Sequence, residues 1–329
     1  MPMLASASSK TEERAETFLR EFAHDVRTGL QKPSQKELHS KYLYDELGTA
    51  LFQAITVLPE YGLTRADTRL LRNYSSEIVR AIRAPARVAE LGSGNGTKTR
   101  HILRALLPLQ SFVAYYPIDL SGAALAGCES ELSDVAEVHP VLDSYLDGLL
   151  QAVGARQPGE SLLVLFLGST IGNFERRCAE AFLQDLRRPL LRGDAVLIGA
   201  DLVKSKDRML LAYDDPTGVT AAFDLNLLGR INRELGGNFD MRRFEHVAIY
   251  NESERRIEMH LRSAADQTVE IPGAGCIVQI RRGETIWTES SHKYSTDELP
   301  SLALKTGFRV CNQWIDEEWP FAESLWVAE

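Results

Sequence analysis

The sequence predicts a doubly wound α/β fold, with a Rossmann-like core and a second, smaller α+β lobe. Two observations in the 329-residue chain predict the core. Near-continuous apolar runs such as LLVLFL at 162–167 alternate with helix-like segments, which is typical of a parallel sheet covered on both faces. The first of these strands leads into a GxGxG turn, where doubly wound folds bind nucleotide-like ligands.

Three helices are expected before the first strand. Residues 1 to about 10 are small and polar and predict a loose tail, followed by an amphipathic helix from about Thr11 to Gly29. Apolar residues at helical spacing predict a second helix from Tyr42, which a proline ends. Thr64 and Asp67 have the spacing of a capping box, so a third helix is expected to start there.

The alternating core follows these helices. We expect its strands at Arg87–Leu91, Phe112–Ile118, Val135–Leu142, Leu163–Leu167 and Ala195–Leu202, and its main helices at Thr97–Leu107, Ser121–Leu132 and Arg177–Leu190.

Beyond Lys204 the alternation stops, and two helix-like segments precede a hairpin-like pair of strands at Phe244–Tyr250 and Arg256–Leu261. The sequence therefore divides into N-terminal helices (1–64), a core (65–205), an inserted lobe joined by the N-terminal helices (206–286) and a return to the core (287–329).

Composition limits the possible partners. The 37 Lys and Arg against 46 Asp and Glu give a net charge of −9, which disfavours long nucleic acid or an anionic membrane surface. The four cysteines form no CxxC pair, and the histidines form no HExxH motif, so no metal is expected. Neither a secretory leader nor a membrane-spanning segment is readable. These features favour a small-molecule substrate and a cytoplasmic enzyme.

The glycine turn predicts the cofactor. In VAELGSGNGT (88–97), Glu90 ends a strand and Gly92, Gly94 and Gly96 let a ligand approach the free N–H groups at a helix start. A NAD fingerprint needs another glycine in place of Thr97, and a P-loop needs a different lysine register, so the turn favours S-adenosylmethionine (SAM). Asp119, ending the next strand, is placed to accept hydrogen bonds from ribose hydroxyls. The alternative is a tight turn without a ligand.

Longer motifs occur together in one order. AELGSGNGTKTR, FLGSTIGNF, AYDDPTGVTAAF, RIEMHLR and TESSHKY, with KYLYDELG and LPEYGLTR upstream, resemble the SAM-dependent histidine N-alpha-methyltransferases of ergothioneine biosynthesis from about Gln31 onward. That family includes relatives acting on other amino acids, notably of the tryptophan type. This chain departs from the family pattern at Gly62-Leu63, where Tyr-Pro is expected, and at Asp143-Ser144, where an aromatic residue follows the acid.

The resemblance implies a reaction and a cofactor site. The implied reaction transfers three methyl groups from SAM to the α-amino nitrogen of L-histidine, giving hercynine. Residues 65–205 would form the SAM-binding core, and 206–286 the substrate-binding lobe. The implied cofactor-binding residues are Glu90, Gly92, Ser93, Gly94, Lys98, Asp119, Asp143 and Ser144.

The resemblance also implies substrate contacts. Asn173 and Tyr213 would bind the carboxylate, with Gly168 and Thr170 in the same wall, and Tyr44, Tyr61 and Phe223 would surround the amine and imidazole. Aromatic faces suit a nitrogen that becomes a permanent cation, by roughly 0.5–2 kcal/mol. Met259 would pack on the ring, and Glu289 and Ser291, which alternate along a strand, would hold its two nitrogens. The implied catalytic residues are Tyr44, Asn173 and Tyr213, with Tyr44 able to relay the amine proton.

Two alternatives remain open. One is a methyltransferase for another amino acid, although Glu289 favours an imidazole over an indole. The other is a methyltransferase-fold binding module without turnover, which the intact glycine turn, Asp119, Asn173 and Tyr213 disfavour.

The Asp214-Asp215 pair is interpreted as a helix-end or interlobe contact, and the protein is expected to be a monomer.

Overall fold

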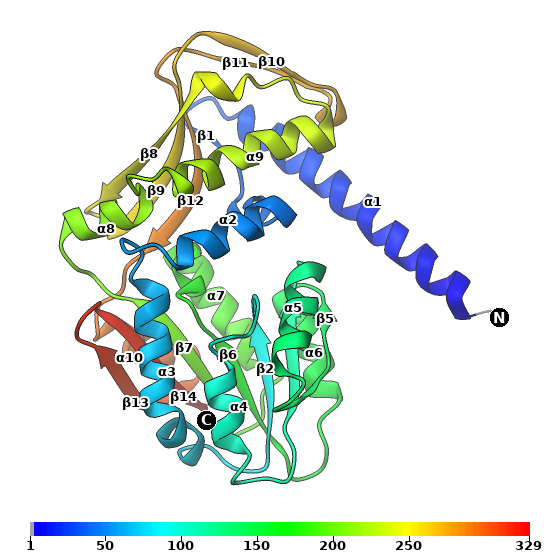
Figure 1. Cartoon of the computed structure of the whole chain (residues 1–329), viewed down its shortest axis with the longest axis vertical. Helices are drawn as coiled ribbons and strands as arrows, with labels where there is room; N and C mark the ends of the chain where they lie inside the picture. Colours follow the sequence, from blue (N-terminus) through cyan, green and yellow to red (C-terminus); the bar gives the residue numbers. More distant parts are fainter. Residues whose placement is uncertain (1–2) are drawn as a thin grey trace. The chain divides into compact units, whose positions relative to one another are not determined.

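The computed structural model describes the backbone of residues 3–329 and the side chains of residues 16–329 (Figure 1). The chain forms two compact units. Unit 1 comprises Met1–Ile55, Tyr213–Ile249 and Glu258–Glu289, and unit 2 comprises Thr56–Ala212, Tyr250–Ile257 and Ser290–Glu329.

Unit 2 is built on an eight-stranded sheet with the order β13-β14-β7-β6-β2-β3-β4, in which β5 also pairs with β3. The pairings of β2 with β3, β2 with β6, β6 with β7, and β3 with both β4 and β5 are parallel, while β14 is antiparallel to β7 and β13. This sheet confirms the doubly wound α/β prediction. Its strands are β2 (Ala86–Leu91), β3 (Ala114–Asp119), β4 (Glu137–Val138), β5 (Val141–Leu142), β6 (Ser161–Phe166), β7 (Ala195–Asp201), β13 (Phe308–Asp316) and β14 (Phe321–Ala328).

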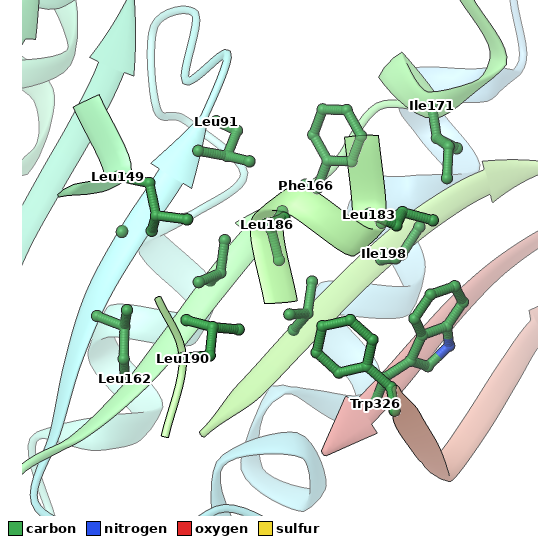
Figure 2. Packing of buried hydrophobic residues seen from close by; sticks show 14 of the residues in the cluster. Leu91, Leu149, Leu162, Phe166, Ile171, Leu183, Leu186, Leu190, Ile198 and Trp326 are labelled. Carbon is green, nitrogen blue, oxygen red and sulfur yellow. The ribbon is translucent and has the colours of Figure 1, made fainter. Parts of the chain in front are cut away.

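Helices cover this sheet, so every residue of β2, β6 and β7 is buried. Figure 2 shows one core layer, in which Leu91, Phe166 and Ile198 from the strands meet Leu183 and Leu186 of α7. Complete burial explains why these strands read as continuous apolar runs rather than as alternating ones. The helices of this part are α3 (Leu63–Arg80), α4 (Arg100–Leu106), α5 (Gly122–Leu132), α6 (Tyr145–Gly154), η2 (Thr170–Asn173), α7 (Arg176–Arg187), α8 (Lys206–Tyr213) and α10 (Glu298–Lys305).

Unit 1 contains a sheet with the order β1-β12-β9-β8, in which β1 is parallel to β12, and a separate antiparallel pair of β10 and β11. The last residues of β8 and β12 and the first of β9 belong to unit 2. Its elements are α1 (Met3–Leu30), β1 (Lys36–Glu37), η1 (Ser40–Leu43), α2 (Glu46–Thr56), α9 (Val219–Leu235), η3 (Met241–Arg243), β8 (Phe244–Asn251), β9 (Arg256–Ser263), β10 (Gln267–Ile271), η4 (Pro272–Ala274), β11 (Cys276–Ile280) and β12 (Thr285–His292).

Two N-terminal expectations were wrong in their bounds. Helix α1 begins at Met3 and not near Thr11, in a segment whose Met, Leu and Ala residues favour helix; of the tail expected at 1–10, residues 1 and 2 lie outside the described residues. The helix expected from Tyr42 is divided into η1 and α2. Asp45 separates them because its carboxylate accepts a hydrogen bond from the Gly48 N–H at 2.7 Å, as a helix start requires.

The capping box expected at Thr64 was also wrong. Helix α3 starts at Leu63, its cap residue is Gly62, and no side chain caps it. Asp67 is instead completely buried and paired with Lys98. Gly62 leaves room for Trp319, because a Cβ atom at this position would lie 2.1 Å from Trp319 Cε3. This contact gives a physical reason for the departure from the family pattern at Gly62-Leu63.

The strand expected at Val135–Leu142 is interrupted as well. It forms two short strands, β4 and β5, with Pro140 between them. Proline has no N–H to donate to a ladder, so it breaks the pairing with β3. In the part of the chain that the structure describes, no helix is long and apolar enough to span a bilayer.

Candidate active site

The glycine turn between β2 and α4 is shaped for close approach of a ligand. Gly92, Gly94 and Gly96 have φ values of 73°, 53° and 69°, a region that favours glycine. A Cβ atom at Gly96 would lie 2.6 Å from Cys128 Sγ, whereas one at Gly94 would meet nothing within 4 Å. Gly96 therefore lets the turn pack against α5, and the backbone of Gly94 is open on the side where the cofactor contact is predicted.

Asp119 lies at the end of β3, next to this turn. Its carboxylate accepts hydrogen bonds from the backbone N–H of Ser121 at 2.9 Å and of Gly94 at 3.2 Å. Burial raises the pKa of Asp119 above its ordinary value, although the N–H groups of Ser121 and Gly94 lower it in part. A carboxylate can accept about four hydrogen bonds. Asp119 therefore keeps acceptor capacity for the two hydroxyls of a ribose, and it fits the predicted cofactor.

Glu90 is buried beneath the same turn. Its carboxylate accepts a hydrogen bond from Thr99 Oγ1 at 2.6 Å and another from Tyr115 Oη. Burial raises the pKa of Glu90 to about 7, and the hydroxyls of Thr99 and Tyr115 limit the rise. Because Thr99 precedes the first residue of α4, Glu90 anchors the start of that helix. A direct contact of Glu90 with the cofactor stays a prediction.

Asp143 and Ser144 stand at the start of α6. Ser144 caps the helix, accepting from the Asp147 N–H at 3.4 Å, and Asp143 accepts from the Ser144 N–H at 2.9 Å. Tyr145 was missed from the sequence, although its hydroxyl lies only 3.1 Å from where a Gly92 Cβ would be. The available signal was an aromatic residue one position later than the family pattern places it.

Asp67 joins two predicted site residues in unit 2. Its Oδ2 atom accepts hydrogen bonds from Lys98 Nζ and from the Gly168 N–H, the latter at 3.0 Å. Burial alone would lower the pKa of Lys98, but the Asp67 carboxylate raises it above the ordinary value. Lys98 is a predicted cofactor residue and Gly168 a predicted substrate residue. One carboxylate from α3 therefore fixes both.

Glu323 on β14 is a buried acid whose neighbour is Asp67. Neither oxygen of Glu323 accepts a hydrogen bond from the described part of the chain, and the same holds for Asp67 Oδ1. Burial, followed by the adjacent Asp67 charge, raises the pKa of Glu323 well above its ordinary value. The raised pKa favours the neutral acid, and a protonated Glu323 would have an O–H to offer Asp67 Oδ1.

Three aromatic rings and one carboxylate meet in unit 1. The ring centroid of Tyr44 lies 5.5 Å from those of Phe52 and Phe223, with edge-to-face geometry. Tyr44 Oη lies 3.5 Å from Glu289 Oε1, at the outer limit of a hydrogen bond. The structure thus brings together Tyr44, Phe223 and Glu289, which lie far apart in the sequence. Phe52 was missed, although its place on the apolar face of α2 could have indicated it.

Tyr213, which ends α8, is held through its backbone. Its carbonyl accepts a hydrogen bond from His246 Nε2 at 2.8 Å, and His246 Nδ1 lies 2.7 Å from Asp224 Oδ2. Both ring nitrogens therefore face acceptors, which favours the charged imidazolium. Burial lowers the pKa of His246, but Asp224 outweighs it and the net shift is upward. His246 was missed because nothing in its local sequence indicates this contact.

The remaining substrate predictions fall on both units. Thr170 Oγ1 donates to the Leu167 carbonyl at 2.9 Å, and Thr288 Oγ1 donates to the Met259 carbonyl at 3.0 Å. Ser291 is buried on β12. Unit 1 contains Tyr44, Tyr213, Phe223, Met259 and Glu289, and unit 2 contains Tyr61, Gly168, Thr170, Asn173 and Ser291.

The structure confirms that Asp215 makes a helix-end contact. It accepts hydrogen bonds from the N–H groups of Val219 at 3.2 Å and Thr220 at 2.7 Å, at the start of α9. Burial opposes its ionisation, but these donors and Thr217 hold the pKa of Asp215 well below its ordinary value. Among the residues whose side chains are described, no group of three or more His, Cys, Asp or Glu could hold a metal ion.

The fold and the glycine turn together define a class. A doubly wound sheet, an open Gly94 backbone at the end of β2 and an acidic acceptor at the end of β3 belong to a SAM-dependent methyltransferase.

Comparison with known proteins identifies the family. The model of the SAM-dependent, histidine-specific methyltransferase family matches residues 22–328. A histidine N-alpha-methyltransferase of Mycolicibacterium smegmatis is 40% identical over 309 residues, covering 92% of this chain and 94% of the relative. The chain therefore belongs to the SAM-dependent, histidine-specific methyltransferase family.

Other relatives are more distant. The ergothioneine biosynthesis protein 1 of Schizosaccharomyces pombe is 32% identical, over 84% of this chain and 37% of that protein. An L-tryptophan methyltransferase of Psilocybe serbica is 28% identical, over 88% of this chain and 87% of the relative. Among solved structures, the CcbJ methyltransferase from Streptomyces caelestis is 14% identical with a TM-score of 0.41, over 84% of this chain and 98% of that one.

Asp119→Ala should weaken SAM binding. Losing hydrogen bonds to a charged acceptor costs about 1.5–3 kcal/mol, or roughly ten- to 150-fold in affinity. Titration calorimetry with SAM and with S-adenosylhomocysteine measures this, and Asp207→Ala, an exposed carboxylate on α8, is the matched control. Equal affinities in the wild type and Asp119→Ala would remove Asp119 from the cofactor site.

Glu323→Leu should destabilise the fold more than Glu323→Gln. Leucine leaves Asp67 Oδ1 without a donor, at a cost of about 1–3 kcal/mol, whereas the Gln amide can still donate. Urea unfolding of both variants and the wild type measures the difference. A Gln variant as unstable as the Leu variant would contradict a protonated Glu323 that donates to Asp67.

The stabilising effect of His246 should decrease as pH rises. Because folding raises its pKa, the contribution is complete below the ordinary His pKa of about 6.5 and is lost as pH passes the raised value. The difference in unfolding free energy between wild type and His246→Gln should therefore be larger at pH 6 than at pH 9. Urea unfolding at both pH values tests this, and a difference that grows with pH would disprove the charged pair.

Proposed function

We propose that the protein transfers three methyl groups from SAM to the α-amino nitrogen of L-histidine and produces hercynine. The observation that carries the proposal is the buried Glu289 carboxylate beside Tyr44, with Phe223 packed on the same tyrosine. A carboxylate can accept an imidazole N–H, and aromatic faces attract a methylated ammonium. The 40% identity to a histidine N-alpha-methyltransferase over most of both chains supports the same substrate.

In this reaction the main task of the protein is to position the amine against the methyl group. SAM supplies an electrophilic methyl group, and the attacking amine must be aligned with it and unprotonated. An α-amino group has a pKa of about 7.7–8.0 in peptides, so a proton must leave the bound substrate near neutral pH. We assign the proton relay to Tyr44, whose hydroxyl faces the Glu289 carboxylate.

The other roles follow the same proposal. Asn173 and Tyr213 bind the substrate carboxylate, and both can donate hydrogen bonds to it. The His246 contact supports this role for Tyr213 because it fixes the backbone at that residue. Gly168 and Thr170 line the carboxylate end, Tyr61 and Phe223 surround the amine, and Met259, Glu289 and Ser291 bind the ring.

The proposed cofactor contacts lie around the glycine turn. Gly92, Ser93 and Gly94 offer backbone to the cofactor, Asp119 accepts from its ribose, and Glu90 and Lys98 support the turn from below. Asp143 and Ser144 stand at the start of α6, beside the end of β5. Residues 65–205 and 287–329 form the core of this proposal, and residues 1–64 and 206–286 the substrate lobe.

We further propose that the enzyme works as a monomer in the cytoplasm, without nucleic-acid or membrane partners. The net charge of −9 supports the absence of polyanionic partners. The four cysteines, all within the described residues, are free thiols, which suits a reducing compartment.

Incubation with excess SAM should convert histidine to its trimethylated product. The same pocket must accept the free, monomethylated and dimethylated amine, so the first two products should remain substrates. Mass spectrometry of separate reactions with histidine, tryptophan and tyrosine tests both the substrate and the number of methyl groups. Arrest at monomethylhistidine, or preferred methylation of another amino acid, would contradict the proposed function.

Glu289→Ala should reduce activity on histidine much more than affinity for the cofactor. A ring N–H left without its acceptor costs about 1–3 kcal/mol, and a site built to pair such a group discriminates strongly. Adding Met259→Val enlarges the ring-facing wall and should raise activity on tryptophan relative to histidine. The test is the ratio of kcat/KM for the two amino acids; a ratio that is constant across the variants would place Glu289 outside the pocket.

A further inference from the structure

Lys293 follows β12 and its side chain is completely buried in unit 2. Its Nζ atom donates a hydrogen bond to Ser291 Oγ at 2.8 Å and lies 2.9 Å from Asp201 Oδ2. An ammonium group has three donors and no acceptor, so the hydroxyl oxygen of Ser291 must be the acceptor in this bond. The hydroxyl hydrogen of Ser291 is therefore directed elsewhere.

Asp201 holds this ammonium in place from the end of β7. Its other oxygen accepts from Lys204 Nζ at 2.6 Å and from Trp319 Nε1 at 2.9 Å. Burial lowers the pKa of Lys204 to about 8, with Asp201 opposing the shift and Lys293 adding to it. One buried carboxylate thus contacts two lysines, and Lys293 is the lysine that contacts Ser291.

Further charged residues surround the Lys293 backbone. Arg176 of α7 donates to the Lys293 carbonyl at 2.7 Å, and the Lys293 N–H donates to the Arg255 carbonyl at 2.7 Å. Glu175 lies 3.6 Å from the ring of the adjacent His292. These contacts fix the chain on both sides of the Lys293 side chain, so its ammonium cannot easily turn away from Ser291.

We propose that Lys293 is a positioning residue that makes Ser291 a hydrogen-bond donor, so that the ring site accepts a neutral imidazole through its unprotonated nitrogen. The inference rests on the proposed function, which places Ser291 at the substrate ring. A protonated imidazole would bring a second cationic donor to an oxygen that already contacts an ammonium, and like charges repel at this distance.

Glu289, two residues before Ser291 on β12, is the proposed partner of the other ring nitrogen. Its carboxylate accepts a ring N–H, while Ser291 donates to the other nitrogen. A neutral imidazole has one donor and one acceptor, so it matches both groups. An indole has a donor but no acceptor, so it would leave the Ser291 O–H without a partner. Lys293 therefore disfavours tryptophan-type substrates through Ser291.

Hercynine is the most direct probe, because its trimethylated nitrogen carries no titratable proton and its pH response reports the ring. We would measure its Kd by calorimetry with protein saturated in S-adenosylhomocysteine, from pH 5 to pH 8. The wild-type Kd should be constant above the ring pKa of about 6.5 and rise roughly tenfold per pH unit below it. A Kd that does not rise at low pH would overturn the inference.

Variants assign the effect to Lys293. Lys293→Met should reduce the low-pH rise to less than about threefold per unit, because the ammonium that repels a protonated ring is then absent. Lys293→Arg keeps the charged donor and should retain the wild-type profile, as should Lys204→Met, which removes the other lysine at Asp201. A wild-type profile in Lys293→Met would overturn the inference.

A measurement on the unaltered protein avoids any question of folding. Ring nitrogen-15 shifts of labelled hercynine bound at pH 6 should show one protonated and one unprotonated nitrogen, and two protonated nitrogens would overturn the inference. Failure of the proposed function itself would give a different result. Wild-type protein saturated with S-adenosylhomocysteine would then not bind hercynine at any pH, and this result would also reject the role of Lys293.

Discussion

Buried near the start of α3, the carboxylate of Asp67 accepts hydrogen bonds from two groups far apart in the sequence, the Lys98 ammonium and the Gly168 N–H. Gly168 opens a short stretch of left-handed backbone, with φ values of 70° at Gly168 and 61° at Ser169. For a residue other than glycine this conformation costs roughly 1–2 kcal/mol. Asp67 on one side, and the Asp201 N–H donating to Ser169 Oγ at 2.9 Å on the other, hold the loop in place.

The charges of unit 2 explain how so many ionisable groups can be buried. Asp67, Glu90 and Glu323 surround the single ammonium of Lys98, and three ionised carboxylates there would leave an uncompensated buried charge. Burial raises the pKa values of Glu90 and Glu323, which reduces the negative charge around this ammonium. At Asp201 the imbalance is reversed, with two lysines on one carboxylate. The first cluster holds the backbone at Gly168 through Asp67, and the second holds the Lys293 ammonium against Ser291.

Much of the fold could be predicted because it depends on local pattern. The apolar runs of β2, β6 and β7 and the glycine turn require only neighbouring residues, and Asp119 follows from the position at which β3 ends. The family motifs supplied the list of substrate residues, which the sequence alone would not have selected. For most of these residues the role stays a prediction, although Tyr44, Phe223 and Glu289 do lie together.

The residues that position the site could not be predicted in this way. Asp67 has the local appearance of a capping residue, and its real partners lie 31 and 101 positions away. His246 and Lys293 likewise act on groups that only the folded chain brings near them. No period or motif encodes such contacts, because burial and the need to satisfy every buried polar group determine them.

The role of Asp67 can be tested most directly by hydrogen exchange of the backbone around Gly168. In Asp67→Ala the Gly168 N–H loses its acceptor, so amides at 167–173 should exchange much faster than in the wild type, while those of the central strands β2 and β6 keep their protection. Unchanged exchange at 167–173 in a folded Asp67→Ala protein would contradict the claim that this carboxylate holds the loop.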